Sequence, residues 1–247
     1  MDTLTENMNR SPRRARLLTG MAAAGLLLGL TACRTTHEVR GDMEESGFLK
    51  DYSQLHESKG DAAKMIYIDT LANWSKYDKI YIEPIELWKA DDPETKLGKL
   101  DKEQQQMLVD YFYTALSNSL SKNFEIVNQA GPGVLVIRGA ITEAKKCRPV
   151  SNLVSTVMPI GMALSLVKRG IFGTGMGVGE CQVEAELLDG ATGRVVAAGM
   201  DRRAGTKALR TKFDGTFGDV KLAMDFWAER LDKNLLDLHE GKNPGDL

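Results

Sequence analysis

The chain has 247 residues, of which 43% are hydrophobic, and its 32 basic residues nearly balance 34 acidic residues for a net charge of −2. This length and apolar content suffice for one domain with a hydrophobic core. The near-neutral charge and the lack of a basic stripe interleaved with aromatic residues argue against a nucleic-acid partner.

The first 32 residues have the pattern of a bacterial export signal. Four arginines precede an apolar run from Leu17 to Leu30, which is too short for a membrane span of about 20 residues. The run ends in "LTAC" (30–33), which resembles the lipobox of bacterial lipoproteins. That resemblance implies cleavage before Cys33 and acylation of the cysteine. We therefore expect a signal peptide over 1–32 and a palmitate-type lipid on Cys33.

The residue after the lipidated cysteine bears on location. In lipoproteins, an aspartate at this place tends to retain the protein in the inner membrane, whereas this chain has Arg34. The resemblance thus implies an outer-membrane lipoprotein whose domain faces the periplasm. One acyl chain anchors a protein only marginally, but the three chains usual for lipoproteins would make release negligible.

Residues 33–45 are polar and without period, which predicts a flexible tether. A single α+β domain is expected over 46–240. Its first segment, "SGFLKDYSQL" (46–55), alternates apolar and polar residues and is predicted to clamp onto the domain. Pro84 marks a bulge or an edge within a strand, because proline donates no ladder hydrogen bond. The expected strands are 64–70, 77–88, 123–129, 134–146, 181–188 and 194–203.

Two segments have the apolar spacing of amphipathic helices. Asp101 is the expected cap of the first helix, which would end near Ser121, and the second covers 216–239. Strands that follow one another as hairpins, with two long helices, predict an α+β sandwich. Both amphipathic helices would pack on one face of a mainly antiparallel sheet, and an apolar, glycine-rich insertion would interrupt it.

Several blocks resemble the DUF3313 family of bacterial lipoproteins. They are "SGFLKDYSQL", "YDKIYIEPIELW", "VEAELLDGATGRVVAA" and "FGDVKLAMDFWAERL", and together they extend over roughly 46–238. The family's D-x-x-T-G-type turn is matched by Asp189, Thr192 and Gly193, and the tryptophan of its last helix by Trp227. Because the family consists of domains of unknown function, the resemblance implies no activity.

Beyond Cys33, the chain has two cysteines, Cys147 and Cys181. An oxidising compartment favours a disulfide between them. They end one expected strand and begin the next, so antiparallel pairing of these strands would bring the two sulfurs to one edge. The chain-entropy model assigns such a loop roughly 3–4 kcal/mol of stabilisation. Metal binding is the alternative, but the paired spacing of a zinc site is missing.

The histidines do not suggest a catalytic site. His37, His56 and His239 fall in the tether, an early loop and the end of the last helix. A catalytic histidine is held by packing and oriented by a partner, and none of these positions predicts that. We therefore expect no enzymatic activity.

Carboxylates at short spacing are the other candidates for chemistry. Glu83 and Glu86 flank Pro84, while Glu184 and Glu186 share one strand face. Such pairs could perform acid–base work or hold a cation. Alternating polar residues are also typical of the solvated face of a sheet, which is the interpretation adopted. No catalytic residue, metal or cofactor is expected.

The stretch "DRRAGTK" (201–207) allows two interpretations. Arg202, Arg203 and Lys207 could bind a phosphate or sugar acid of an envelope glycolipid. Alternatively, the charges protect an edge strand from pairing with other chains. The glycines of "GTGMGVG" (173–179) follow an apolar segment and lead into a strand, which excludes a phosphate-binding loop.

The insertion at 150–179 is unusually apolar, with no charge in "VSNLVSTVMPIGMALSLV" (150–167). It could pack on the second face of the sheet, or it could contact the membrane or another subunit through exposed methionines. The residues proposed for such a contact are Met158, Pro159, Met162, Leu166, Phe172 and Met176.

These observations predict a non-enzymatic, lipid-anchored protein of the outer membrane. It would act in envelope assembly, maintenance or transport by binding a protein partner or a second copy of itself. The alternative is a protein that binds an envelope glycolipid or peptidoglycan.

Overall fold

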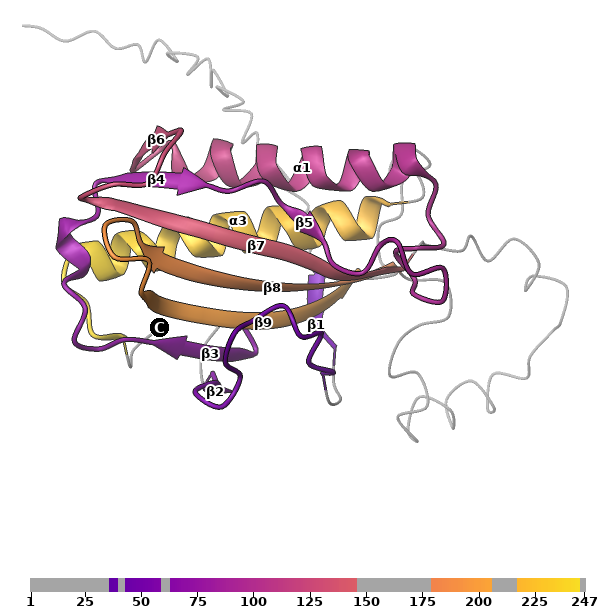
Figure 1. Ribbon diagram of the computed structural model, residues 1–247, viewed down its shortest axis with the longest axis horizontal. Coiled ribbons are helices and arrows are strands. Elements are labelled where there is room, and N and C mark those ends of the chain that lie inside the picture. The colour runs from indigo at the N-terminus through magenta and orange to yellow at the C-terminus, as the bar shows by residue number, and fades with distance from the viewer. Residues whose placement is uncertain (1–35, 40–42, 59–62, 146–178, 206–216, 245–247) are drawn as a thin grey trace, which may run out of the picture. The chain divides into compact units, whose positions relative to one another are not determined.

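The computed structural model describes residues 36–39, 43–58, 63–145, 179–205 and 217–244. Within these ranges, one mixed β-sheet packs against two helices (Figure 1), which confirms the α+β class. The export segment and positions 150–178 of the insertion lie outside them. None of the helices in the described ranges has the length and hydropathy needed to cross a membrane.

The described part of the sheet has nine strands, and seven of them follow the order β2-β3-β9-β8-β7-β4-β6. β1 pairs with β9, and β5 pairs with β7. The strands are β1 (Thr36–Glu38), β2 (His56–Glu57), β3 (Met65–Ile68), β4 (Lys79–Ile82), β5 (Glu86–Leu87), β6 (Glu125–Val127), β7 (Val134–Lys145), β8 (Glu180–Asp189) and β9 (Val195–Gly205).

Antiparallel pairs join β1, β2, β3, β7, β8 and β9, but the sheet also has a parallel side. β4 and β5 run parallel to β7, and β6 runs parallel to β4. Parallel neighbours need a long crossover, and a helix supplies it between β5 and β6. Sequence periodicity alone gave no sign of this direction.

The segment expected as one strand over 77–88 forms two, β4 and β5. Pro84 lies between them, where it cannot donate a ladder hydrogen bond. The pairing with β7 continues on both sides, since the Glu83 amide donates to the Ile137 carbonyl (2.9 Å) and the Trp88 amide to the Ile141 carbonyl (3.0 Å). The interruption is thus local.

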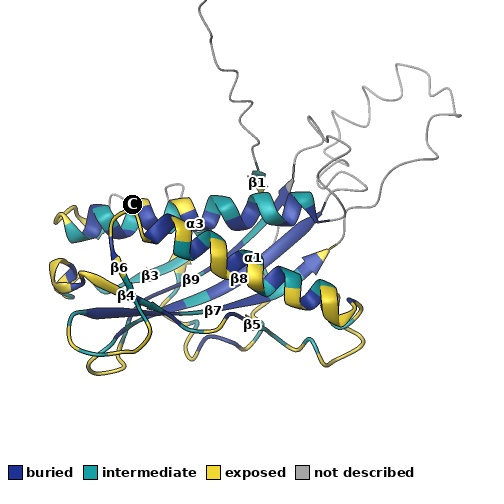
Figure 2. Ribbon diagram, turned by 90° about the horizontal axis from the view of Figure 1, so that it is seen from above, coloured by how far each residue is buried: buried dark blue, intermediate teal, exposed yellow. Residues whose placement is uncertain are grey.

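Helix α1 (Lys102–Leu120) begins as expected after Asp101, whose side chain accepts a hydrogen bond from the Gln104 amide (2.8 Å). Helix α3 (Gly218–His239) packs against α1, and both contribute to one continuous core with the sheet (Figure 2). The short 3-10 helix η1 (Trp74–Lys76) precedes β4. The buried helix residues include Leu108, Phe112 and Leu116 of α1 and Met224, Trp227 and Leu235 of α3.

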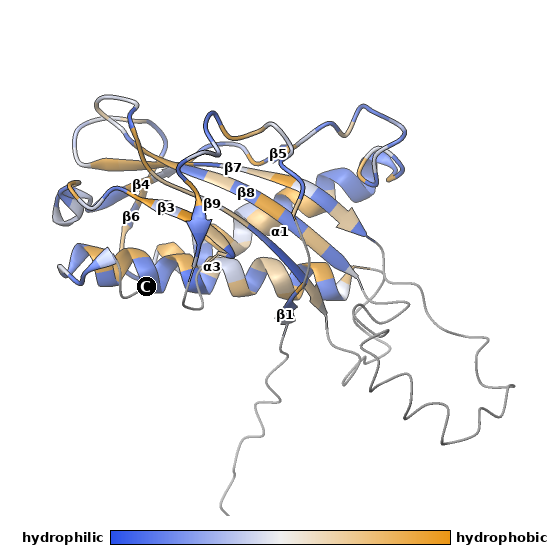
Figure 3. Ribbon diagram, turned by 90° about the horizontal axis from the view of Figure 1, so that it is seen from below, coloured by the Kyte–Doolittle hydropathy of each residue, from blue (hydrophilic) through white to orange (hydrophobic). Residues whose placement is uncertain are grey.

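The other face of the sheet is covered by residues 46–55, which we call the strap. Its Phe48 and Leu49 are buried with Ala140 of β7, and the Phe48 ring packs edge-on against Trp88 at 5.3 Å. Hydrophobic and hydrophilic residues are mixed along β8, whereas β9 has an apolar first half and a charged stretch at Asp201–Arg203 (Figure 3). The contacts of the strap confirm the prediction that this segment clamps onto the domain.

The expectation of a flexible tether over residues 33–45 is partly wrong. Thr36–Glu38 form β1, which pairs with Arg203–Gly205 of β9, and Val39 is buried against Ala204. A polar strand of three residues has too few apolar side chains to show the two-residue period of a strand. It is recognised only by its pairing with β9. The domain therefore begins closer to Cys33 than position 46.

The β8–β9 hairpin turns through Asp189, as the family resemblance implied. Asp189 Oδ1 accepts hydrogen bonds from the amide (2.9 Å) and hydroxyl (2.8 Å) of Thr192. Its Oδ2 accepts from Lys76 Nζ (2.5 Å) and the Tyr77 hydroxyl (2.9 Å). These donors, Lys76 foremost, hold the pKa of Asp189 well below its ordinary value.

Candidate ligand-binding cavity

A row of small residues crosses the centre of the sheet. Gly139 of β7 lies opposite Ala185 of β8, and Ala185 lies opposite Gly199 of β9. By the two-residue alternation of a strand, Ala185 points to the same face as Val183 and Leu187, which belong to the core shared with the helices. This row therefore leaves space beneath the helical layer, where larger side chains would fill it.

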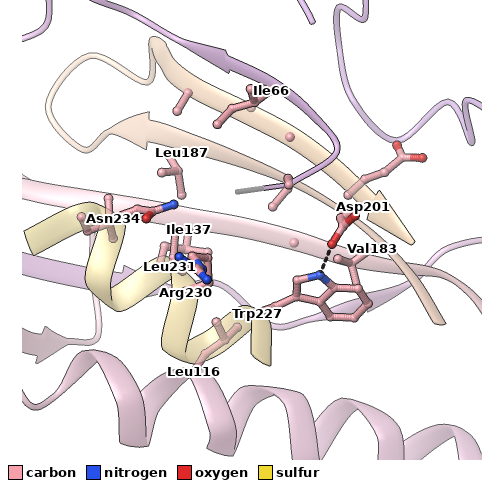
Figure 4. A pocket seen from close by; sticks show the side chains of 18 of the residues that line it. Ile66, Leu116, Ile137, Val183, Leu187, Asp201, Trp227, Arg230, Leu231 and Asn234 are labelled. Carbon is pink, nitrogen blue, oxygen red and sulfur yellow. Dashed lines mark hydrogen bonds between the residues drawn. The ribbon is translucent and has the colours of Figure 1, made fainter. Parts of the chain in front are cut away.

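That space is a cavity of about 160 Å³ between α3 and strands β3, β7, β8 and β9 (Figure 4). Its walls are mainly aliphatic and aromatic, with Ile66, Ile137, Leu187, Phe226, Trp227 and Leu231 among them. A cavity of about 150 Å³ with similar walls is large enough to bind benzene. The cavity can thus hold about six carbon atoms.

The cavity is partly open to solvent. Ala185 and Gly199 are only partly buried, although both lie in interior strands beneath a helix. Ile66 and Ile68 of β3 are also partly buried, and both line the cavity. A sheet residue covered by a fully packed helix would be shielded from solvent. The accessible surface at the sheet centre is therefore the wall of this cavity, which is large enough to admit a water-sized molecule.

Few polar side chains point into this cavity. One of them is the carboxylate of Asp201, which is 1% exposed. Asp201 Oδ2 accepts a hydrogen bond from the indole Nε1 of Trp227 (2.7 Å), drawn in Figure 4. Arg203 also contacts this oxygen (3.4 Å), and its guanidinium lies 3.6 Å from the centroid of the Phe226 ring. Sheet and helix are thus joined by a buried polar contact at the cavity.

The carboxylates Glu184 and Glu186 point to the opposite face, where the strap occupies them. Glu184 accepts hydrogen bonds from the Ser46 amide (3.1 Å) and the Tyr52 hydroxyl (2.5 Å). Glu186 accepts from the Lys50 amide and from Arg138, both at 2.9 Å. The expectation of a solvated face is wrong here, because the two residues are 0% and 2% exposed. Glu83 and Glu86 lie around Pro84 instead, and Glu86 is exposed.

The arginines of "DRRAGTK" are not brought together. Arg202 points toward Glu180, with which it makes a 2.6 Å ion pair, whereas Arg203 points toward α3. Adjacent residues of a strand face opposite sides, so the two cannot bind one anion jointly. The alternative of a charged edge strand is also wrong, because β9 pairs with β8 on one side and with β3 and β1 on the other. Lys207 lies outside the described residues.

The histidines lie apart from one another. His37 is exposed in β1, His56 is exposed in β2, and His239 ends α3 with its ring 6.0 Å from that of Phe124. His37 is therefore in a strand and not in a tether. Among the described residues, no group of three potential metal ligands gathers at one place.

Of the cysteines, only Cys181 is described, and it is buried in the core. Burial raises the pKa of its thiol, which disfavours the reactive thiolate. β7 and β8 are antiparallel neighbours as expected, and Cys181 lies opposite Ala144, three positions before Cys147. The disulfide stays a prediction, because Cys147 lies outside the described residues, as do Cys33 and the six proposed contact residues of the insertion.

Thiol titration tests the disulfide. Protein isolated from the cell envelope and denatured without reductant should contain no titratable thiol, since Cys33 would be acylated and the other two joined. After reduction, two thiols per chain should appear. Two thiols before reduction would contradict the disulfide.

The sequence did not predict the cavity, which is lined by Gly139, Ala185, Gly199, Asp201 and Trp227. Trp227 is noted above only for the family resemblance, and Asp201 only as part of "DRRAGTK". One signal was present: small residues interrupt strands that are otherwise rich in large apolar residues, as in "VVAAGM" (195–200). Their alignment across three strands depends on register, which the sequence did not provide.

An α+β domain that follows a segment resembling a lipobox indicates a bacterial lipoprotein. The chain belongs to the family described as "Protein of unknown function (DUF3313)", whose profile matches residues 44–231. It is 26% identical to "Uncharacterized lipoprotein YdcL" of Escherichia coli strain K12 over 230 residues, which cover 89% of this chain and 96% of that protein. These findings confirm the family resemblance.

Several solved structures are also similar at low identity. A PelC dodecamer from Paraburkholderia phytofirmans is 15% identical with a TM-score of 0.37, over 72% of this chain and 95% of that chain. A minor lipoprotein from Acinetobacter baumannii is 12% identical with a TM-score of 0.28, over 68% and 97% of the two chains.

Proposed function

We propose that this chain is a non-enzymatic lipoprotein, anchored in the outer membrane through Cys33, whose periplasmic domain binds an apolar chain in the cavity beneath α3. The leader with its lipobox and the lipoprotein relative support the anchor. The accessible row of small residues supports the binding role. Of the two sequence-based hypotheses, this one is nearest to the binding of an envelope lipid, with the acyl chain as the recognised part.

The observation that carries the proposal is the partial accessibility of Ala185 at the centre of the sheet. Burial of about six carbons at roughly 0.8 kcal/mol each would contribute about 5 kcal/mol. Because association also costs translational and rotational freedom, the dissociation constant would be about 0.2 mM or weaker. The cavity alone would thus hold the end of a chain weakly and reversibly, which suits a protein that exchanges ligand with a membrane.

The contacts of the candidate catalytic groups support a non-enzymatic role. Donors of the strap occupy both oxygens of Glu184 and one oxygen of Glu186, and Arg138 of β7 occupies the other. General acid–base catalysis needs a group within hydrogen-bond reach of a substrate proton. Contact with a protein partner through the 150–179 insertion stays a prediction, which crosslinking from Met162 in intact cells would test.

Filling the cavity is expected to abolish binding without unfolding the protein. Every described element lies within 36–244, so residues 33–247 with Cys33→Ser should fold without leader or lipid. In this chain, Ala185→Leu adds three carbons to the cavity and should raise the free energy of unfolding by about 1 kcal/mol. Calorimetric titration with hexan-1-ol should show saturable binding that Ala185→Leu removes.

The matched control is Ala191→Leu, which adds the same carbons at an exposed position in the β8–β9 turn. It should bind hexan-1-ol as the unsubstituted chain does, with stability changed by less than about 0.5 kcal/mol. Binding that survives Ala185→Leu would place the ligand elsewhere and would contradict the proposed function.

A further inference from the structure

The inner wall of the cavity contains a buried carboxylate whose second oxygen is unused. Asp201 lies in β9 opposite Val183, faces the helical layer and is 1% exposed. Its Oδ2 accepts from Trp227 and Arg203. Its Oδ1 is buried and has no hydrogen-bond partner among the described residues. A buried acceptor without a donor is costly, so native proteins seldom keep one without a reason.

The surroundings of Asp201 restrict what could satisfy this oxygen. The adjoining walls are apolar, since Val183 and Trp227 also line the cavity. The guanidinium of Arg203 already contacts the carboxylate and balances its charge. A cationic ligand would therefore add an unbalanced charge to an apolar cavity, which is unfavourable. A neutral hydrogen-bond donor on an otherwise apolar molecule fits both conditions.

We propose that the ligand of this cavity is a hydroxylated alkyl or acyl chain, whose hydroxyl group donates a hydrogen bond to Asp201 Oδ1. This inference rests on the proposed function, because it assigns the chemical class of the same ligand. The aliphatic part of the chain would occupy the space over Ala185 and Gly199. Trp227 would orient Asp201, because its indole N–H keeps Oδ2 engaged and leaves Oδ1 for the ligand.

Two isomeric probes test this assignment on residues 33–247 with Cys33→Ser. Hexan-1-ol donates a hydrogen bond, whereas 1-methoxypentane has the same atoms and no donor. The alcohol should bind at least about fivefold more tightly, because a buried acceptor left unpaired by the ether weakens its binding. Calorimetry or chemical-shift titration would measure both dissociation constants.

The variant Asp201→Asn provides a second readout. The Trp227 N–H requires an acceptor, so the amide oxygen should take the place of Oδ2 and the amide NH2 group that of Oδ1. The cavity then presents a donor, which both probe oxygens can satisfy. The ratio of the two dissociation constants should fall to about one, because this variant binds the ether more tightly than the unsubstituted chain does.

The outcomes are distinguishable. Equal affinities of the unsubstituted chain for both probes would mean that water, and not the ligand, satisfies Oδ1, and would overturn this inference while leaving the cavity as a binding site. Failure of both probes to bind would overturn the proposed function itself. The comparison on the unsubstituted chain needs no variant, so it decides the question even if Asp201→Asn does not fold.

Discussion

Replacing Asp189 by alanine should lower the free energy of unfolding by about 2–4 kcal/mol, because several donors lose their acceptor. The ion pair with Lys76 adds little to this loss, since the Lys76 side chain is 43% exposed. Without Asp189, the Tyr77 hydroxyl and the Thr192 amide lose their partner inside the fold. Tyr77 is only 2% exposed, so water cannot readily replace the carboxylate. Chemical denaturation followed by circular dichroism would measure the change.

A surface ion pair serves as the control for Asp189. Glu125 and Lys79 are 3.5 Å apart, with side chains 64% and 46% exposed. Glu125→Ala should therefore cost less than about 1 kcal/mol. A similar loss of stability in both variants would contradict the role assigned to Asp189.

The stabilisation by Asp189 should also depend on pH. Because its folded-state pKa lies below the unfolded value, this contribution is fully present above about pH 4 and is lost as the pH falls toward the folded-state pKa. Asp189→Asn cannot ionise, so the stability difference between it and the unsubstituted chain should shrink below about pH 4. A difference that stays constant down to pH 2 would contradict this account.

The second large effect is expected at Glu184, which holds the strap. Glu184→Ala leaves the Ser46 amide and the Tyr52 hydroxyl without their acceptor and should cost about 2–4 kcal/mol. The strap should then detach more often. Lys50 is an exposed strap residue, so trypsin cleavage after Lys50 under native conditions reports detachment.

Glu184→Gln is the matched variant for the strap. Glutamine can still accept from the Tyr52 hydroxyl, but its NH2 group would face the Ser46 amide, where two donors meet. Its stability and its cleavage rate should lie between those of Glu184→Ala and the unsubstituted chain. If Glu184→Ala leaves cleavage after Lys50 unchanged, Glu184 does not hold the strap, and its other contacts, among them the hydrogen bond from the Lys50 amide to Glu186, suffice.

Periodicity predicted the elements better than their arrangement. The helix cap at Asp101 and the hairpin at Asp189 were placed correctly because both depend on residues close in sequence. The strand pairing of Thr36–Glu38 and the interior position of β9 were not predicted, since both depend on partners more than a hundred residues away. Local patterns determine elements, whereas pairing depends on the whole chain.

The candidate site shows the same contrast between local sequence patterns and long-range pairing. Glu184 and Glu186 have the alternation of a solvated sheet face, but a strap from the other end of the domain buries them. Ala185 between them looks like an ordinary strand residue until Gly139 and Gly199 are aligned with it. The cavity exists because three neighbouring strands have small residues at the same position of the sheet. This alignment cannot be read from any one strand alone.

The most direct test of the account is to locate a bound chain. Crystals of residues 33–247 with Cys33→Ser, soaked with 6-bromohexan-1-ol, allow the bromine to be placed by its anomalous scattering. The account predicts a bromine peak inside the cavity, in contact with residues such as Ala185 and Trp227, that is lost in Ala185→Leu. Bromine bound only on the outer surface, or the same peak in Ala185→Leu, would contradict it.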